Sequence, residues 1–162
     1  MLGHSTGHVG QSLWLDLCHD GREGAPPPVD LSVERRLGEL LRKLVGEGRV
    51  SAAHDISDGG ALFAIAEMAI ASGIGVEISL PNVPNPASVL FGEDQGRALV
   101  TTSDPDSVIA AATTANIFAA PIGQTGGDAV SGPGFSASIA DLRAAHEGFF
   151  PKLMGGELTP EF

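Results

Sequence analysis

The stretch V-S-A-A-H-D-I-S-D-G-G-A-L-F-A-I-A-E-M-A-I-A-S-G, from Val50 to Gly73, decides the fold. Its apolar start, Val50 to Ala53, predicts a buried strand, and the apolar run from about Ala61 to Ser72 predicts a helix that Gly73 ends. The polar residues 54–60 between them form a turn, which we call the elbow. A strand, a glycine turn and a helix in this order are typical of the place where α/β proteins put their chemistry.

The polar side chains of the elbow could bind a metal ion or could serve only to stabilise the turn. Gly59 and Gly60 let the backbone turn sharply, and Asp58 is placed to cap the helix, because its carboxylate can accept from first-turn amides. Asp55 lies at the strand end, is not needed for capping, and is free to hold a Mg²⁺ ion that bridges phosphate oxygens. In the structural alternative Asp58 caps, Asp55 binds loop amides and His54 fills a polar gap. Spacing alone leaves both interpretations open.

A second acidic segment lies in L-F-G-E-D-Q-G-R-A-L-V-T-T, residues 90–102. Glu93, Asp94 and Gln95 stand between a short apolar pair and a strand expected over Ala98 to Thr102. Taken by themselves, these three residues are most simply an ordinary turn with its charges in solvent.

Composition bounds the class of protein. The chain has 162 residues, of which 43% are hydrophobic, enough for a domain with a substantial core. Its net charge of −11 argues against nucleic acid or an anionic membrane as partner. The single cysteine, Cys18, excludes an internal disulfide and fits a reducing cytoplasm. No apolar run reaches the ~20 residues that a membrane helix needs.

The rest of the chain alternates expected helices and strands, which predicts an α+β fold with a mixed β-sheet covered by helices. The helix expected over Leu31 to Gly46 is the clearest, because four leucines recur on one stripe. The other expected elements are a turn-rich loop over 3–12, strands over 12–19, 75–80 and 116–122, loops over 81–86 and 131–135, a turn over 123–127, a helix from the Asp104 cap to about Ala115, and a helix over 142–149 that Asp141 caps and Pro151 ends.

Five motifs together resemble one family. They are G-H-V-G-Q-S-L at 7–13, G-A-P-P-P-V-D-L at 24–31, H-D-I-S-D-G-G at 54–60, L-F-G-E-D-Q-G-R at 90–97 and L-R-A-A-H-E-G-F-F-P at 142–151. They resemble the last domain of phosphoribosylformylglycinamidine synthase subunit II, in the superfamily of aminoimidazole ribonucleotide synthase. The resemblance implies a companion domain over residues 1–154, with the fold of the C-terminal domain of that synthase, and a disordered tail over 155–162.

The resemblance also implies a function for the longer parent enzyme. That enzyme converts formylglycinamide ribonucleotide, ATP and glutamine-derived ammonia into formylglycinamidine ribonucleotide in purine biosynthesis, with Mg²⁺ as cofactor. The implied partners are the ATP-handling domains of the same parent chain, a glutaminase subunit and a small accessory subunit, all cytoplasmic. The chain alone is expected to be inactive, because the ATP-handling domain is not in it.

Site residues are carried over from the matching motifs. The resemblance implies that Asp55 binds Mg²⁺ and that Glu93, Asp94, Gln95 and His54 face the substrate, with no catalytic residue in this chain. Because the match is to the second copy of this domain in the family enzyme, an auxiliary nucleotide site is the alternative to a productive one. Another superfamily member, such as aminoimidazole ribonucleotide synthase or thiamine monophosphate kinase, and a non-catalytic scaffold half are the further alternatives.

Overall fold

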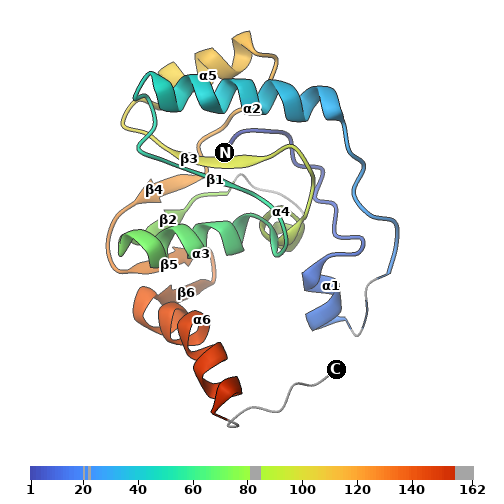
Figure 1. Ribbon diagram of the computed structural model, residues 1–162, viewed down its shortest axis with the longest axis vertical. Helices are drawn as coiled ribbons and strands as arrows, with labels where there is room; N and C mark the ends of the chain where they lie inside the picture. The colour runs from blue at the N-terminus through green and yellow to red at the C-terminus, as the bar shows by residue number, and fades with distance from the viewer. Residues whose placement is uncertain (20, 22, 81–84, 156–162) are drawn as a thin grey trace. The chain divides into compact units, whose positions relative to one another are not determined.

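The computed structural model describes residues 1–19, 21, 23–80 and 85–155 (Figure 1). The chain divides into two compact units. The first contains Met1–Ile65 and Leu80–Ile122, and the second contains Ala66–Ser79 and Gly123–Phe162. Helix α3, Gly60–Ser72, begins in the first unit and ends in the second. None of the helices in the described ranges is both long and apolar enough to cross a membrane.

The first unit is built on a two-stranded antiparallel sheet. Strand β1, Ala52–Asp55, pairs with β3, Ala98–Thr101, in a register that sets Asp55 opposite Ala98. Leu2 bridges both Ala98 and Ala119, which adds the chain's start to the same sheet. Helices α2 and α5 lie together over this sheet (Figure 1), and the bounds are Leu31–Gly46 for α2 and Pro105–Thr114 for α5.

A leucine-rich cluster forms the core of this unit. Helix α2 begins where the Asp30 carboxylate accepts hydrogen bonds from the amides of Ser32 and Val33. Its apolar stripe then packs under α5 and against β3. The buried members of the cluster are Leu2, Leu37, Leu40, Leu44, Ala98, Val108, Ala112 and Ile117.

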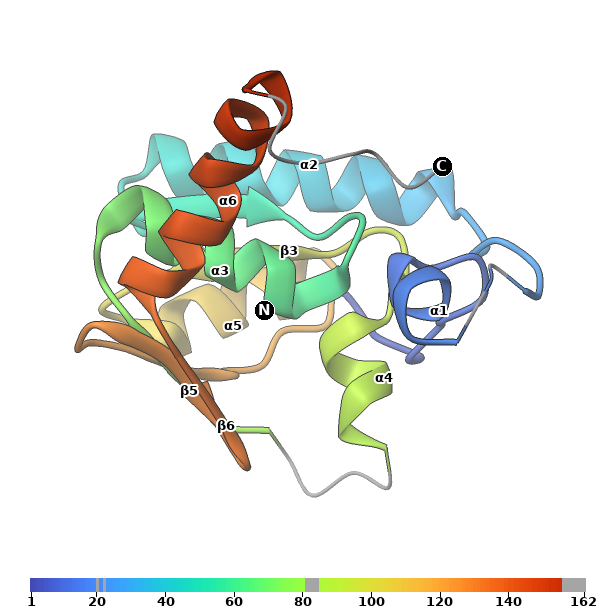
Figure 2. The ribbon, with the colours of Figure 1, turned by 90° about the horizontal axis from the view of Figure 1, so that it is seen from below.

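Two short helices complete the first unit. Helix α1 spans Leu13–Cys18 and α4 spans Pro86–Phe91, with Asn85 as the N-cap of α4. Their aromatic side chains meet, since Trp14 stacks on Phe91 with ring centroids 6.4 Å apart, and Figure 2 shows the two helices as neighbours.

The second unit contains a four-stranded mixed sheet in the order β4-β2-β5-β6. Strand β2, Val76–Ile78, is antiparallel to β4, Gly123–Thr125, and parallel to β5, Ala129–Gly132. Strand β6, Phe135–Ser138, forms an antiparallel hairpin with β5 and leads into helix α6, Ile139–Met154. The α+β class, with a mixed sheet and helices, is therefore confirmed, and a separate two-stranded sheet accompanies it.

Several predicted elements are confirmed and others are wrong. The helices over 31–46 and 104–115 and the strands over 75–80 and 98–102 are found. The alternating residues 12–19 form helix α1 in place of a strand, because the Ser12 hydroxyl caps it by accepting from the Leu15 amide. The strand predicted from Val50 is found as β1, but Ala52 and Ala53 are exposed, so its predicted burial is wrong.

The glycine-rich C-terminal third contains most of the remaining errors. Residues 116–122 contribute only an isolated bridge at Ala119, strand β4 occupies the predicted turn, and strands β5 and β6 overlap the two ends of the predicted loop. Helix α6 begins at Ile139, capped by Ser138, and continues through Pro151. Asp141, predicted as the cap, lies in the first turn of α6, where its carboxylate accepts a hydrogen bond from the Ser138 hydroxyl at 2.7 Å. The tail from 156 and loop residues 81–84 lie outside the described residues.

Replacement of Leu44 by alanine tests the leucine cluster. Leu44 is 0% exposed, so its truncation leaves a cavity that should lower the free energy of unfolding by about 2–5 kcal/mol. Val45→Ala is the matched control on the same helix, because Val45 is 56% exposed and should cost no more than about 0.5 kcal/mol. Urea unfolding followed by circular dichroism measures both, and equal losses in the two variants would contradict this core.

Candidate functional site

The elbow connects β1 to α3 through two glycines that hold left-handed backbone angles. Gly59 and Gly60 have φ of 80° and 72°, a region that residues with a side chain rarely adopt. A Cβ at Gly60 would lie 2.7 Å from the carbonyl oxygens of Leu90 and Gly92. Since Ile56 also donates from its amide to the Arg97 carbonyl at 3.1 Å, the elbow packs directly against residues 90–97.

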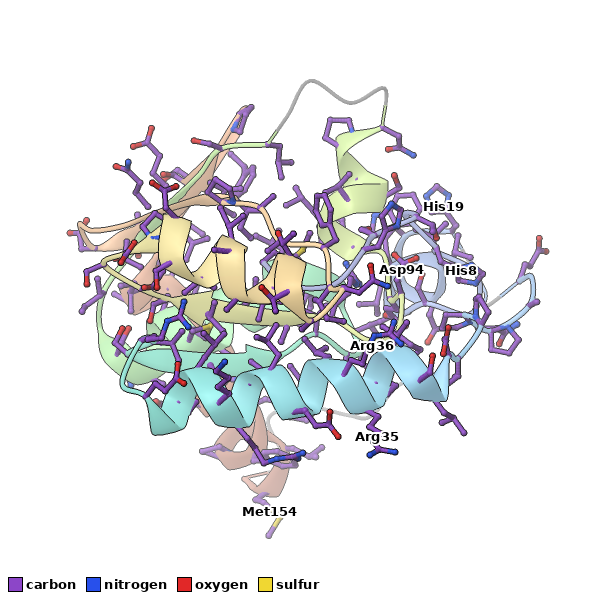
Figure 3. The ribbon with its side chains drawn as sticks, turned by 90° about the horizontal axis from the view of Figure 1, so that it is seen from above. His8, His19, Arg35, Arg36, Asp94 and Met154 are labelled. Carbon is purple, nitrogen blue, oxygen red and sulfur yellow. The ribbon has the colours of Figure 1, made fainter. Side chains whose placement is uncertain are left out.

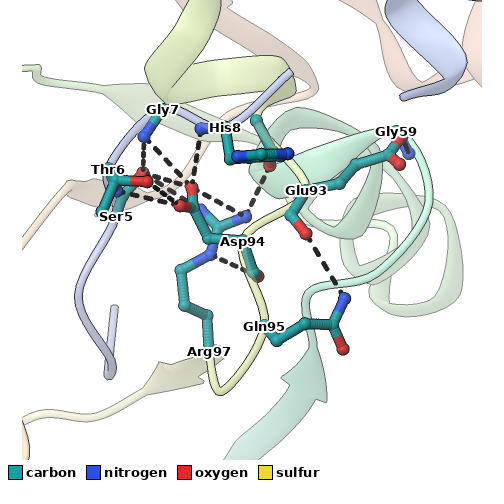
Figure 4. Close-up of polar contacts among 10 residues, drawn as sticks. Ser5, Thr6, Gly7, His8, Gly59, Glu93, Asp94, Gln95 and Arg97 are labelled. Atoms are coloured by element: carbon teal, nitrogen blue, oxygen red, sulfur yellow. Dashed lines mark hydrogen bonds and ion pairs between the residues drawn. The ribbon is translucent and has the colours of Figure 1, made fainter. Parts of the chain in front are cut away.

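The Glu93 carboxylate holds the elbow in place (Figure 4). One oxygen, Oε1, accepts hydrogen bonds from the amides of Gly59 and Leu13, both at 2.8 Å, and Glu93 is only 8% exposed. The same carboxylate therefore joins the elbow to the first residue of α1. Asp58 was expected to bind the amides at this turn, but its side chain stays exposed and Glu93 takes that place.

The Asp94 carboxylate is enclosed by the N-terminal loop, residues 5–8. Figure 4 shows donors from one side converging on its two oxygens. Three consecutive backbone amides form a nest that suits an anion, and two hydroxyl groups add to it. The donors are the amides of Thr6 (3.0 Å), Gly7 (3.1 Å) and His8 (3.2 Å), the hydroxyl of Ser5 (3.1 Å) and the hydroxyl of Thr6.

Arg97 lies beneath this loop with 2% of its surface exposed. Its guanidinium donates to the carbonyls of Asp94 and Gly92 and to the Ser5 hydroxyl, and its Nη2 lies 4.0 Å from an Asp94 carboxylate oxygen. Burial lowers the pKa of Arg97, against the opposing effect of the two neighbouring carboxylates. Burial alone would raise the pKa of Asp94, but the hydrogen bonds from Thr6 and His8 and the charge of Arg97 together lower it.

Among the residues of the predicted site, Gln95 and Asp55 are exposed and His54 is half-buried. Gln95 is exposed and donates to the Glu93 carbonyl at 3.4 Å. The Asp55 side chain is 81% exposed, with its Oδ1 3.7 Å from Nδ1 of His54. His54 Nδ1 also lies 2.6 Å from the Asp55 carbonyl oxygen. The two acidic segments are thus neighbours, joined by the Glu93 bond to the elbow.

The set of donors near Asp55 limits what metal this chain could hold. Within the described ranges, no three His, Cys, Asp or Glu side chains gather closely enough to bind a metal ion. Mg²⁺ is commonly bound through one or two carboxylates together with phosphate oxygens and water. Asp55 therefore fits one ligand position of a shared site, and the described residues do not form a complete metal site around it.

The N-terminal loop and Arg97 also belong to this site, although neither was predicted to do so from the sequence. Ser5, Thr6 and Arg97 supply hydroxyl and guanidinium groups to the acidic segment, although about 90 residues separate the loop from it. The signal available was the run of small polar residues and glycines at 3–12, which indicates a loop but not its partner.

Replacement of Gly60 by valine tests the contact between the elbow and residues 90–92. The added side chain would collide with backbone oxygens that cannot move aside, so we expect a loss of at least about 3 kcal/mol of stability, or failure to fold. Gly48→Val is the control, since Gly48 has a similar φ of 66° with nothing within 4 Å of a Cβ. Equal melting temperatures for the two variants would contradict the close approach.

Acid titration of stability tests the ionised state of Asp94. Because the folded-state pKa of Asp94 is lowered, its contribution is present above the unfolded value of about 3.9 and is lost as the pH falls through the folded value. Asp94→Asn should cost about 1–3 kcal/mol at pH 7 and should flatten the loss of stability below about pH 4. Asp106→Asn, at an exposed position, is the control. Unfolding curves for Asp94→Asn that parallel the wild type at every pH would contradict an ionised Asp94.

Comparison with known proteins identifies the family of this chain. The family model described as AIR synthase related protein, C-terminal domain, matches residues 1–134. The chain is 45% identical over 157 residues to phosphoribosylformylglycinamidine synthase subunit PurL of Rhizobium meliloti (strain 1021), covering 95% of this chain and 21% of the relative. The same subunit of Caulobacter vibrioides is 43% identical over 155 residues, with the same two shares covered. The chain thus spans about a fifth of the length of the curated relatives it matches.

Solved structures show the same fold. The structure of Thermotoga maritima PurL complexed with FGAR matches with a TM-score of 0.72 at 21% identity, covering 88% of this chain and 27% of that one. The PurLQS structure from the same organism matches with a TM-score of 0.66 at 22% identity, covering 88% and 25%. At these identities the likeness is evidence for the fold, while the family follows from the sequence match. The chain belongs to the family of AIR synthase related protein C-terminal domains.

Proposed function

We propose that this chain is the C-terminal companion domain of a phosphoribosylformylglycinamidine synthase subunit II. The observation that carries the proposal is the 45% identity to the Rhizobium meliloti PurL subunit over 95% of the chain. The parent enzyme is an amidoligase in which ATP activates the amide oxygen of formylglycinamide ribonucleotide and glutamine-derived ammonia displaces it. The chain alone is inactive in this proposal, because it spans only about a fifth of such relatives.

The predicted substrate-facing residues divide into two roles in this proposal. Gln95 is exposed and His54 is half-buried, so both side chains can reach a ligand, whereas Glu93 and Asp94 use their carboxylates on backbone amides of the same unit. Glu93 and Asp94 therefore position the ligand-facing segment, and Gln95 and His54 contact the ligand. The division follows from burial, since a carboxylate already surrounded by donors has little capacity left for a substrate.

Asp55 is proposed as one ligand of a Mg²⁺ ion shared with nucleotide phosphates and with another domain of the parent. Its exposed carboxylate at the strand end suits this shared coordination. Mg²⁺ would supply charge neutralisation for phosphate oxygens. The proposed partners are the ATP-handling domains of the same chain, a glutaminase subunit and a small accessory subunit, and the proposed location is the cytoplasm.

An auxiliary, non-catalytic nucleotide site is the second candidate for this elbow. It is favoured by the hydrogen bonds that Glu93 and Asp94 make within the unit, because these commit both buried carboxylates to backbone amides. The two candidates differ in turnover, because a substitution in an auxiliary site changes nucleotide binding or stability without a matching loss at the chemical step.

Asp55→Asn in the parent polypeptide tests the metal role. We expect Mg²⁺-dependent binding of ADP, measured by calorimetry, to weaken at least roughly tenfold, with an unchanged melting temperature because the side chain is exposed. Asp106→Asn is the control for a lost surface charge in the same unit. Unchanged ADP affinity together with unchanged turnover would contradict a metal role for Asp55. Weakened ADP binding with unchanged turnover would favour the auxiliary site.

A further inference from the structure

A groove between α2 and α5 gathers positive charge on a chain whose net charge is −11. Five of the nine lysines and arginines fall within residues 35–49, which cover most of α2 and the turn that follows it. Three of them line the groove, whose volume is about 610 Å³: Arg36, Lys43 and Arg49. Because this charge is opposite to that of the chain as a whole, the groove would attract an anionic partner.

The three cations differ in exposure, since Lys43 is exposed, Arg36 is half-buried and Arg49 is already paired. Arg49 is held in place by hydrogen bonds to Ser107 and by an ion pair with Glu47 at 3.2 Å. Lys43 is exposed at the groove. The Arg36 Nη1 donates to the Ser32 hydroxyl at 3.2 Å, while its Nε is buried and has no hydrogen-bond partner within the described ranges.

The acidic groups nearest the groove are engaged elsewhere. Glu39 lines the groove, but its Oε1 accepts from Nε of Arg35 at 2.9 Å, and this pairing lowers the pKa of Glu39. Asp30 lies near Arg36, and its carboxylate caps α2 through the amides of the first turn. The groove therefore keeps a positive balance of charge.

The spacing of Arg36 and Lys43 fits a helical partner. They lie seven residues apart on α2, which is two turns or about 10.5 Å along one face. Leu40 lies between them at the base of the groove. The facing side, from α5, offers the small side chains of Ala110, Ala111 and Ala115. Small residues allow the close approach that helix packing requires, at about 8–10 Å between axes.

We propose that this groove binds an acidic amphipathic helix of a partner protein. Two carboxylates of that helix, two turns apart, pair with Arg36 and Lys43, and its small apolar residues between them pack on the alanines of α5. This interaction is separate from the elbow and its ligand, so it does not depend on the proposed enzymatic role.

A synthetic helical peptide tests the proposal. The peptide carries glutamates two turns apart with alanine and leucine between them, and a control peptide of the same composition places the glutamates on opposite faces. Fluorescence anisotropy with the full chain should show binding of the first peptide that is at least roughly tenfold tighter than binding of the control, and this binding should weaken with added salt.

Matched variants separate the groove from general electrostatics. R36Q/K43Q should weaken peptide binding roughly tenfold, whereas R42Q/K152Q, with the same charge change at exposed residues that do not line the groove, should alter it less than about threefold. Figure 3 shows Arg35 and Arg36 leaving α2 on different sides. Circular dichroism checks that both variants fold. Equal weakening by the two variants, or equal binding of the two peptides, would overturn the proposal. So would sedimentation showing a groove-dependent dimer that does not bind the peptide, because the occupant would then be a second copy.

Discussion

The structure of the first unit depends on two adjacent buried carboxylates, Glu93 and Asp94, and on the backbone amides that satisfy them. Taking a carboxylate out of water is costly unless donors replace the lost hydration. Here the donors come from three separate stretches: the N-terminal loop, the start of α1 and the elbow. Because leaving either charge without donors would be costly, the three stretches are held next to residues 93 and 94. The same hydrogen bonds therefore stabilise the fold of the unit and shape its candidate site.

In the proposed function, this arrangement separates the residues that support the site from those that contact a ligand. The carboxylates of residues 93 and 94 point into the unit, and the side chains of Gln95 and Asp55 stay open. In that proposal, groups from the parent's other domains would complete the site, because one carboxylate and one amide cannot enclose a ligand. The leucine cluster under α2 and α5 carries the sheet on which the elbow is built.

Elements that depend on neighbouring residues were predicted better than elements that depend on contacts distant in sequence. Helix α2 was predicted with its observed bounds because Asp30 and the leucine stripe act locally. Helix α1 was predicted as a strand, since the alternation of Leu13, Leu15 and Leu17 outweighed the cap that Ser12 provides. Strands β5 and β6 were missed because glycine and serine pairing in a hairpin has no strong periodic signal.

The candidate site was also predicted only in part from the sequence. Its members could be identified from two motifs, but their roles could not, because the Asp94 donors lie about 90 residues away in sequence. A turn with exposed charges and a turn with buried carboxylates have the same local pattern. Only the long-range fold distinguishes Asp94, which is buried, from Gln95, which is exposed.

Hydrogen exchange in Glu93→Met tests the central claim most directly. Methionine has nearly the same length and no carboxylate, so the amides of Gly59 and Leu13 should lose their acceptor together. The account predicts that both amides exchange faster by a factor of at least roughly ten, while the amides within α2 keep their protection. Unchanged protection at both amides, or loss at one alone, would contradict a single carboxylate that holds the elbow and α1 in place.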